Sequence, residues 1–292
     1  THRNILMRMA NKVVGTVGFE SKSVKPLGGE MAMELGDSNM DASRIGLGCM
    51  RMADMSVQEV SKLINIALDN GVNLFDHADI YGAGRSEEVF GKALAENKGM
   101  RERMRIQTKC GIRDGYYDFS AAHILSSVDD SLRRLQTEYI DLLLLHRPDA
   151  LMDVEEVADT LHQLQRTGKV RRFGVSNFTS AQIELLQSVC KVPIQVNQMQ
   201  FGLMHAGMIQ QGLEANMLTD GAASRDMAVL DYCRLHNITI QAWSPLQYGF
   251  FEGSFIDNEK FPEVNDVLGR IAEERHVTKS AIAIAWILRH PA

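Results

Sequence analysis

Four side chains that can give or take protons stand at similar places in this sequence. Asp76, Lys109 and His146 each end a short strand-like run, and Tyr81 follows the first of those runs by five residues, just before two glycines that let the backbone turn. Brought to one place, a phenol can serve as a proton donor while a lysine and a histidine shift its proton affinity. The carboxylate would hold the lysine charged. The set predicts general acid/base chemistry.

Each of these residues also has a purely structural interpretation. Asp76 alone fits a turn, and Lys109 fits a strand end with a buried stem. His146 fits a satisfied core histidine, and Tyr81 fits a loop aromatic. Their shared position at strand ends favours the chemical interpretation for the group. No serine or cysteine is obviously paired with a base, so the sequence gives little support to nucleophilic catalysis.

These runs belong to a regular alternation of strand-like and helical stretches. The seven strand candidates are 45–49, 73–76, 105–109, 141–146, 170–177, 193–198 and 239–244. The helical stretches between them are 57–70, 123–135, 154–167, 180–188 and 225–237, together with a helix through Leu94 that Ser86 is predicted to cap. A small hairpin before 45–49 leads into the first strand.

Strands separated by helices imply a parallel sheet, and right-handed crossovers leave either an open doubly wound sheet or a closed barrel. The glycine pattern disfavours a dinucleotide-binding open sheet, because IGLGCMRM lacks the third glycine and GAGRSEE places Glu87 there. In a barrel, polar residues with chemical roles lie at the carboxyl ends of several strands, around one mouth. The sequence therefore predicts an α/β fold of the (β/α)8 TIM barrel type.

The composition fits a globular protein with a large core, since 45% of the 292 residues are apolar and 23% are charged. A formal net charge of -6 without a long lysine or arginine run disfavours nucleic acid as a partner. No apolar run reaches membrane-spanning length, and residues 1–19 lack the hydrophobic centre of a secretory signal. Widely spaced cysteines without a CxxC pair predict free thiols and a cytoplasmic setting; they are Cys49, Cys110, Cys190 and Cys233.

Six motifs, in order and at these separations, closely resemble the aldo-keto reductases, (β/α)8 barrels that reduce carbonyl groups with NADPH. The motifs are FDHADIYGAGRSEEVFGKAL, QTKCGI, DLLLLHRPD, GKVRRFGVSNF, QVNQMQF and AWSPL. The resemblance runs from about Glu34 to the end and is strongest to bacterial oxidoreductases whose second strand ends in DHADIYG. We therefore expect an N-terminal extension over residues 1–33, outside the fold, and a barrel over residues 34–292.

The resemblance implies an NADPH-dependent oxidoreductase that reduces an aldehyde or ketone to an alcohol, with NADH as a possible substitute. It makes Asp76, Tyr81, Lys109 and His146 the catalytic tetrad. Tyr81 would protonate the developing alkoxide, and Lys109 would lower the pKa of that phenol. Asp76 would orient Lys109, and His146 would position the carbonyl oxygen.

The resemblance also implies where the cofactor binds. The nicotinamide carboxamide would meet Ser176, Asn177 and Gln198, and Trp243 would stack on the nicotinamide ring. The nicotinamide ribose would lie beside Met50 and Arg51, with Asp76 also at the cofactor, and the pyrophosphate would lie along Ser244, Pro245 and Leu246.

Two departures from the family pattern leave alternatives open. The chain ends at WILRHPA, after the helix of the seventh unit, so either the eighth strand and helix are missing from it, which we expect, or the fold is closed in an unusual way. Family members grip the adenosine 2′-phosphate in that segment, so a preference for NADPH rests on the resemblance alone. The second departure is His77, beside Asp76, which either packs or hydrogen-bonds under the active site, or binds a metal with Asp79 and His146, as in a metal-dependent hydrolase.

A further alternative is a cofactor-sensing subunit with little turnover, although the complete tetrad favours an enzyme. Cys110 is expected to be buried, because neighbouring residues of a strand point to opposite sides. The expected partner is a small carbonyl compound, and the sequence does not indicate an oligomeric state. Aromatic residues in two loops suggest an apolar or aromatic substrate; they are Tyr116, Tyr117, Phe119, Tyr248, Phe250 and Phe251.

Overall fold

The computed structural model describes residues 32–36, 38–249 and 252–290, which form two compact units. The sheet unit holds residues 32–199 and 225–240, and the C-terminal unit holds residues 200–224 and 241–290. Of the predicted extension, residues 1–31 lie outside the described residues, so that prediction stays a prediction. Residues 32 and 33 begin the first strand. Phe250 and Phe251 also lie outside the described residues.

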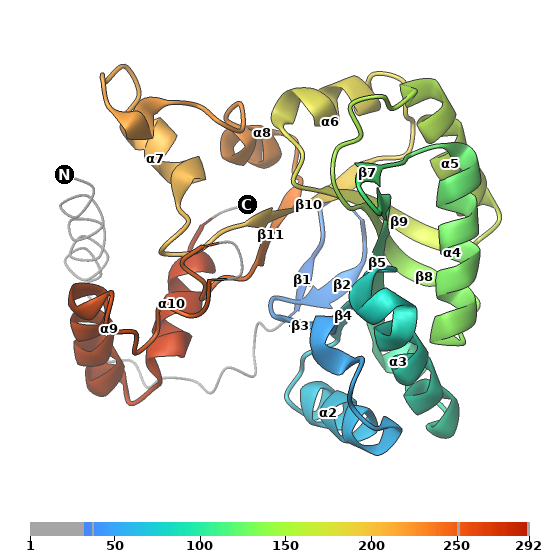
Figure 1. Cartoon of the computed structure of the whole chain (residues 1–292), viewed down its shortest axis with the longest axis horizontal. Helices are drawn as coiled ribbons and strands as arrows, with labels where there is room; N and C mark the ends of the chain where they lie inside the picture. Colours follow the sequence, from blue (N-terminus) through green and yellow to red (C-terminus); the bar gives the residue numbers. More distant parts are fainter. Residues whose placement is uncertain (1–31, 37, 250–251, 291–292) are drawn as a thin grey trace. The chain divides into compact units, whose positions relative to one another are not determined.

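The sheet has seven strands, and their order in the sheet is the same as their order along the chain, as in a (β/α)8 barrel (Figure 1). They are β3 (Gly46–Gly48), β4 (Leu74–Asp76), β5 (Arg105–Cys110), β8 (Ile140–Leu145), β9 (Val170–Ser176), β10 (Ile194–Gln200) and β11 (Thr239–Trp243). All pairings from β3 to β10 are parallel. The seven predicted strands are confirmed, and the fold is of the (β/α)8 type, with no eighth barrel strand among the described residues.

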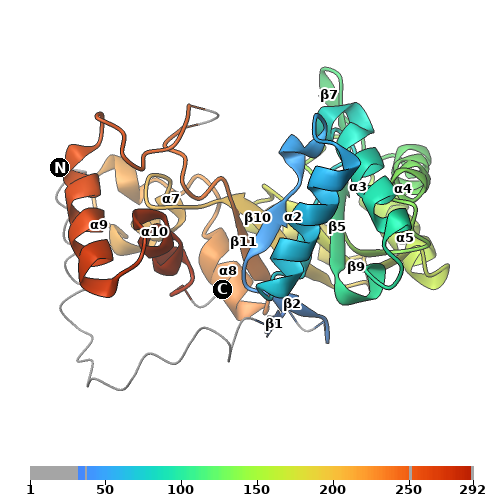
Figure 2. The ribbon, with the colours of Figure 1, turned by 90° about the horizontal axis from the view of Figure 1, so that it is seen from below.

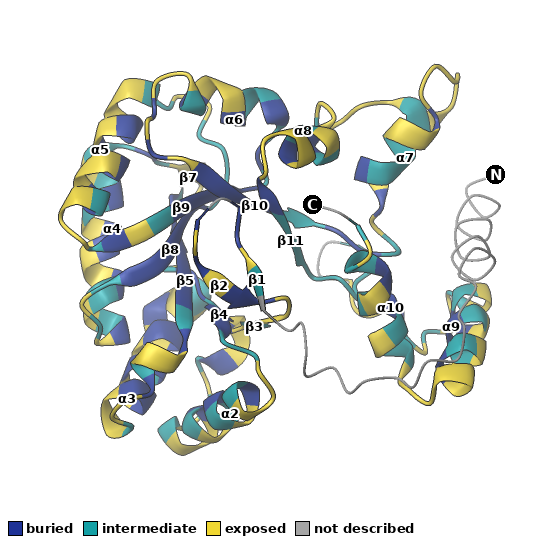
Figure 3. Cartoon of the chain, turned by 180° about the vertical axis from the view of Figure 1, so that it is seen from behind, coloured by how far each residue is buried: buried dark blue, intermediate teal, exposed yellow. Residues whose placement is uncertain are grey.

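Helices connect these strands and pack on the outside of the sheet. In the sheet unit they are α2 (Val57–Asp69), α3 (Arg85–Glu96), α4 (Ala121–Leu135), α5 (Val154–Arg166), α6 (Ser180–Gln187) and α8 (Val229–Leu235). In Figure 3 the buried residues of α4 and α5 recur along the helix side that faces the sheet, as an apolar helical stripe requires. No helix in the described part of the chain has the length and apolarity needed to cross a membrane.

Two helix starts differ from the sequence prediction. Ser86 does not cap α3: the cap position is Gly84, and the buried Ser86 hydroxyl donates to the backbone oxygen of Met50 at 3.3 Å. The stretch predicted as 225–237 becomes helical only at Val229, because Met227 and Ala228 have φ angles of 56° and 57°. Positive φ angles do not continue a right-handed helix.

A hairpin fills the inner side of the sheet. It consists of β1 (Ala32–Glu34) and β2 (Asp41–Ser43), paired antiparallel, as the sequence predicted. Its buried residues pack against inward-facing strand residues in one cluster, made up of Leu35, Met40, Ala42, Leu74, Leu142, Leu144 and Val196. A separate cluster joins the outer face of the sheet to α2 and α3, with Phe75, Phe90 and Ile106 among its buried members. Strands β5 and β8, in the middle of the sheet, are therefore buried on both faces.

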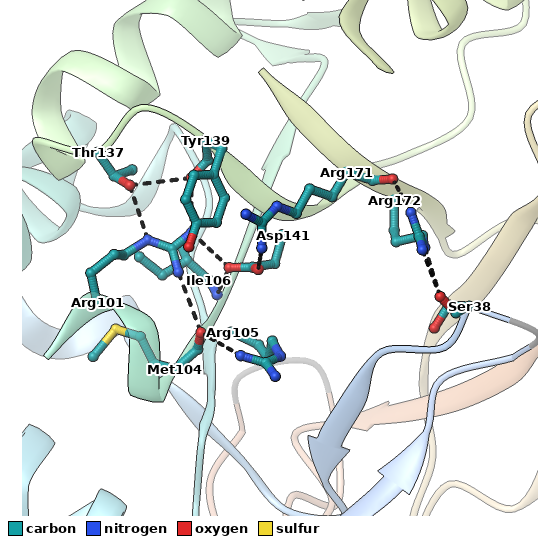
Figure 4. A network of polar contacts seen from close by, with 10 residues as sticks. All are labelled: Ser38, Arg101, Met104, Arg105, Ile106, Thr137, Tyr139, Asp141, Arg171 and Arg172. Atoms are coloured by element: carbon teal, nitrogen blue, oxygen red, sulfur yellow. Dashed lines mark hydrogen bonds and ion pairs between the residues drawn. The ribbon is translucent and has the colours of Figure 1, made fainter. Parts of the chain in front are cut away.

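The amino-terminal ends of β5, β8 and β9 meet in a polar network (Figure 4). Asp141, with only 2% of its side chain exposed, accepts from Arg101 at 2.7 Å and from Arg171 at 3.4 Å. Both guanidinium groups also lie over the Tyr139 ring, at 3.9 Å and 3.6 Å from its centroid. Next to this network, Arg172 donates to the backbone oxygen of Ser38 in the hairpin. Charge and cation–π contacts thus tie three strands and the hairpin together.

The C-terminal unit has its own small core. Its helices are α7 (Gly207–Leu213), α9 (Pro262–Arg275) and α10 (Lys279–Ile287), of which α9 and α10 pack together (Figure 2). Phe255, Leu268 and Ala283 are buried at the centre of this packing. Asn265 fixes the preceding loop, because its side chain donates to the backbone oxygens of Phe255 and Phe261 at 2.8 Å and 3.0 Å.

Candidate active site

Lys109 is the centre of a hydrogen-bonded cluster at the carboxyl ends of β4 and β5. Its Nζ donates to Asp76 Oδ1 at 2.7 Å, to the backbone oxygen of His77 at 2.8 Å and to Tyr81 Oη at 3.2 Å. The Lys109 side chain is fully buried, whereas 18% of the Asp76 side chain is exposed. Three acceptors satisfy the three ammonium protons of a charge that would otherwise be costly to bury.

A tight turn between β4 and α3 directs Tyr81 toward Lys109. The N–H of Tyr81 donates to the backbone oxygen of Ala78 at 3.1 Å, and Gly82 and Gly84 then take φ angles of 57° and 89°. A β-carbon at Gly82 would lie 2.4 Å from the side chain of Ala53. Glycine is therefore required there by both conformation and space, as the sequence suggested.

His146 completes the group from the end of β8. Its N–H donates to the backbone oxygen of Cys110 at 2.9 Å, and its ring lies 6.3 Å from the Tyr81 ring, centroid to centroid, at 82°. Burial, followed by the charges of Lys109 and Arg147, lowers the pKa of His146 to about 3. The imidazole is therefore neutral at neutral pH and can donate one N–H to an oxygen atom.

The pKa values of Lys109 and Tyr81 follow from burial and mutual attraction. Burial works to lower the pKa of Lys109, but Asp76 and Tyr81 outweigh it, so the pKa is raised and the ammonium stays charged. Burial raises the pKa of Tyr81, and Lys109 lowers it by less. Lys109 thus lowers the pKa of Tyr81, as expected, but burial outweighs it, so the phenol holds its proton more firmly than a free tyrosine.

His77 lies on the opposite side of the strand from Asp76. It is fully buried, its ring contacts Phe90 of α3 edge-on at 4.5 Å, and neither ring nitrogen has a hydrogen-bond partner among the described residues. Burial, followed by the charge of Lys109, lowers its pKa to about 3. Within the described ranges no three His, Cys, Asp or Glu residues are grouped so as to hold a metal. The geometry therefore favours the packing interpretation of His77 over the alternative of a metal site with Asp79 and His146.

The residue that argued against a dinucleotide fingerprint, Glu87, is a buried anchor behind the site. Its carboxylate accepts from Thr108 at 2.6 Å, from Ser131 at 3.1 Å and from Arg134 at 2.7 Å. Nearby, burial and then the charge of Glu87 raise the pKa of Asp79 to about 7. These contacts fix α3 and α4 on the outer face of β5, directly behind Lys109.

All four cysteines are buried and none forms a disulfide bond. Cys110 has 1% of its surface exposed, as the strand alternation predicted. Burial, followed by the charges of Asp79 and Glu87, raises the pKa of its thiol well above the usual value. A thiol of this kind is a poor nucleophile.

Several residues expected at the cofactor lie at the carboxyl ends of strands in the sheet unit. The Ser176 hydroxyl donates to the backbone oxygen of Gln198 at 2.9 Å, and the Asn177 side chain donates to Ser176 Oγ at 2.9 Å. Asn177 has a φ angle of 63°, a conformation that asparagine tolerates better than most residues. Met50 and Arg51 are exposed at the end of β3. Hydroxyl and amide groups that both donate and accept suit a carboxamide.

The other expected cofactor residues belong to the C-terminal unit. Trp243 ends β11, and Ser244 follows with a φ angle of 46°. Gly202 lies against the backbone of Pro245: a β-carbon at Gly202 would be 2.4 Å from the backbone oxygen of Pro245. Leu246 packs against the core of that unit. The structure thus unites the four predicted acid/base residues, Met50, Arg51, Ser176, Asn177 and Gln198 in one unit, and places Trp243 to Leu246 in the other.

The cluster also contains Gln107, which no sequence motif singles out. Gln107 is fully buried, and its Nε2 donates to Asp76 Oδ1 at 2.5 Å. Strand alternation was the available signal, because Gln107 lies two residues before Lys109 in RIQTK and so projects from the same face.

Comparison with known proteins identifies the class. The model of the aldo/keto reductase family matches residues 44–292. An uncharacterized oxidoreductase of Bacillus subtilis, YcsN, is 36% identical over 268 residues, which cover 87% of this chain and 83% of that protein. A 6-dehydroglucose reductase of Agrobacterium fabrum is 37% identical over 267 residues, which cover 87% of this chain and 82% of that protein.

A solved structure agrees with these sequence matches. A thermostable aldo-keto reductase in complex with the inhibitor epalrestat superposes with a TM-score of 0.70 at 28% identity, over 89% of this chain and 86% of that one. This chain belongs to the aldo-keto reductase family. It is accordingly an NAD(P)H-dependent oxidoreductase, and the class of reaction is carbonyl reduction.

Proposed function

We propose that this chain reduces an aldehyde or ketone to the alcohol with NADPH, and that Tyr81 is the general acid. The observation that carries the proposal is the fully buried Lys109 ammonium, which donates to Asp76 Oδ1 at 2.7 Å and to Tyr81 Oη at 3.2 Å. A bound NADPH would supply the hydride. The protein would supply the proton and the electrostatic environment.

The side chains of the cluster divide the remaining work among them. As negative charge develops on the carbonyl oxygen, Tyr81 Oη gives it a proton. The Lys109 charge then stabilises the phenolate that remains, and Asp76 keeps Lys109 in place. The neutral imidazole of His146 donates an N–H to the same carbonyl oxygen and so orients the substrate.

We assign to the residues named for the cofactor the roles that the family resemblance implies. Ser176, Asn177 and Gln198 would hold the nicotinamide carboxamide, since their groups both donate and accept hydrogen bonds. Asp76 would also face the nicotinamide side of the cofactor. The other residues in this proposal are Met50 and Arg51 at the ribose, Trp243 on the ring, and Ser244, Pro245 and Leu246 at the pyrophosphate.

Two observations bear on the substrate. Tyr116 and Tyr117 are exposed on a short hairpin after β5, whereas Phe119 is buried and stacks on Phe178, which leaves it unable to line a pocket. Exposed tyrosines offer aromatic faces together with hydroxyl groups. The Agrobacterium relative is named for an oxidised sugar. We therefore propose a small carbonyl compound and would test aromatic aldehydes beside hydroxylated carbonyl compounds.

The test is a titration with NADPH and NADH, followed by turnover of that carbonyl panel. We expect tighter binding of NADPH and its consumption with at least one substrate. Tyr81→Phe should bind the cofactor as the parent does and lose about 10²- to 10⁴-fold in kcat, the usual contribution of a general acid. Normal turnover by Tyr81→Phe would refute the proposed role.

A further inference from the structure

We propose that Gln107 is a positioning residue that fixes Asp76 and, through it, Lys109. The register of β4 and β5 places Gln107 directly opposite Asp76. Its Nε2 donates at 2.5 Å to Asp76 Oδ1, the same oxygen that accepts from Lys109 Nζ at 2.7 Å. This inference rests on the proposed function, because it assigns a part in the same acid/base cluster.

The surroundings of Gln107 show why an amide is placed there. The side chain is fully buried, and the register pairs Gln107 with Leu142 and Lys109 with Leu144 on the next strand, both of them members of the inner apolar cluster. A buried amide in an apolar layer is stabilising only when it is hydrogen-bonded. The carboxylate of Asp76 provides that bond, so each group fixes the other.

The hydrogen bond has a consequence for Tyr81. A carboxylate held by one donor can still turn about its terminal bond, whereas two donors from neighbouring layers of β5 set the position of Oδ1. That oxygen sets the position of Lys109 Nζ, which in turn donates to Tyr81 Oη. Because the amide is neutral, it orients Asp76 without offering it a second cation, so the charge of Asp76 stays directed at Lys109.

Two near-isosteric substitutions test this role. Gln107→Met keeps the length and volume of the side chain and removes the N–H donor. Gln107→Glu keeps the shape and places a second carboxylate against Asp76. We expect the rate constant for NADPH oxidation in a single turnover, with enzyme in excess over NADPH and saturating aldehyde, to fall about tenfold or more in Gln107→Met, as loss of one charge-assisted hydrogen bond implies. The rate constant of Gln107→Glu should be lower still. The affinity of Gln107→Met for NADPH should stay within about twofold of the parent, since the hydrogen bond acts on the chemical step and not on the binding of the cofactor.

A single turnover separates positioning from folding. With active sites in excess, the rate constant does not depend on how much of the protein is inactive. The matched control is Thr108→Val, on the same strand and equally buried but bonded to Glu87 on the opposite face. Thr108→Val should lower the thermal midpoint and leave the rate constant unchanged.

The outcomes distinguish this inference from the function on which it rests. A parental rate constant in Gln107→Met would overturn the positioning role, and so would an equal loss in Thr108→Val. If Tyr81→Phe retains the parental rate constant in the same assay, the proposed function itself is wrong. Both the positioning role and the proposed function would be supported if the rate constant is reduced in Gln107→Met, reduced further in Tyr81→Phe and unchanged in Thr108→Val.

Discussion

Replacement of His77 by phenylalanine should make the protein less sensitive to acid. His77 is fully buried, without hydrogen-bond partners for its ring nitrogens among the described residues, and its pKa is lowered to about 3. An unfolded chain binds a proton at this residue below its ordinary pKa of about 6.5, whereas the folded chain does not until about pH 3. The free energy of unfolding therefore falls as the pH drops through this interval.

The size of the effect follows from the interval. Each pH unit between the two pKa values costs about 1.4 kcal/mol, so His77 removes about 2 kcal/mol between pH 7 and pH 5. His146, with a pKa lowered to about 3, acts in the same direction. Asp79, with a pKa raised to about 7, acts in the opposite direction, because the folded chain then holds a proton that the unfolded chain has lost. Comparing variant with parent isolates His77 from both.

The assay is urea unfolding of the parent and His77→Phe at pH 7 and pH 5, followed by circular dichroism. The loss between the two pH values should be about 2 kcal/mol smaller in the variant. A phenylalanine ring can also strain the packing against Phe90, but that cost is the same at both pH values and cancels. His162→Gln, on the exposed face of α5, is the control. Equal losses in His77→Phe and the parent would refute the reasoning.

Two further predictions follow from the site and its support. Arg134→Met should lower the free energy of unfolding by about 3 to 5 kcal/mol, because it leaves the buried Glu87 carboxylate without its cation. The neighbouring Arg133→Met removes only an exposed ion pair and should cost about 0.5 kcal/mol or less. Comparable losses for the two variants in urea unfolding would contradict this prediction. The kcat/KM for carbonyl reduction should stay level from about pH 6 to pH 9, because the raised pKa of Tyr81 keeps the phenol protonated and the lowered pKa of His146 keeps the imidazole neutral. A fall in kcat/KM centred at about pH 6.5 would show instead that His146 titrates with an ordinary histidine pKa.

The strands could be predicted because short strand-like runs alternate regularly with helical stretches along the chain. The convergence of Asp76, Lys109 and Tyr81 followed from the same pattern, since parallel strands bring their carboxyl ends to one edge. The predicted start of α3 was wrong, because Gly84, with a φ angle of 89°, ends the turn and takes the cap position that Ser86 was expected to fill. A left-handed glycine leaves no local signal that separates it from an ordinary loop glycine.

Contacts between distant residues are the part that the sequence alone did not reveal. By sequence Glu87 is the first of two acidic residues at the start of a helix, yet its partners Thr108, Ser131 and Arg134 come from β5 and α4. The bond from Gln107 to Asp76 likewise depends on the register of two strands, and an amide in RIQTK does not by itself indicate a carboxylate partner. Such pairs become visible only when the strands are aligned.

Strands β5, β8 and β9 have different roles at their two ends: the polar network anchors the amino-terminal ends, and the carboxyl ends carry candidate site residues. Each begins within or beside the contacts of Asp141 and ends at a candidate site residue, namely Lys109, His146 or Ser176. Strands of six or seven residues separate the two ends by roughly 20 Å. Loops at the carboxyl ends can therefore be diversified to change substrate choice while the anchoring end stays untouched. A combinatorial library built on this chain would place its variation in those loops and keep Arg101, Asp141 and Arg171 constant.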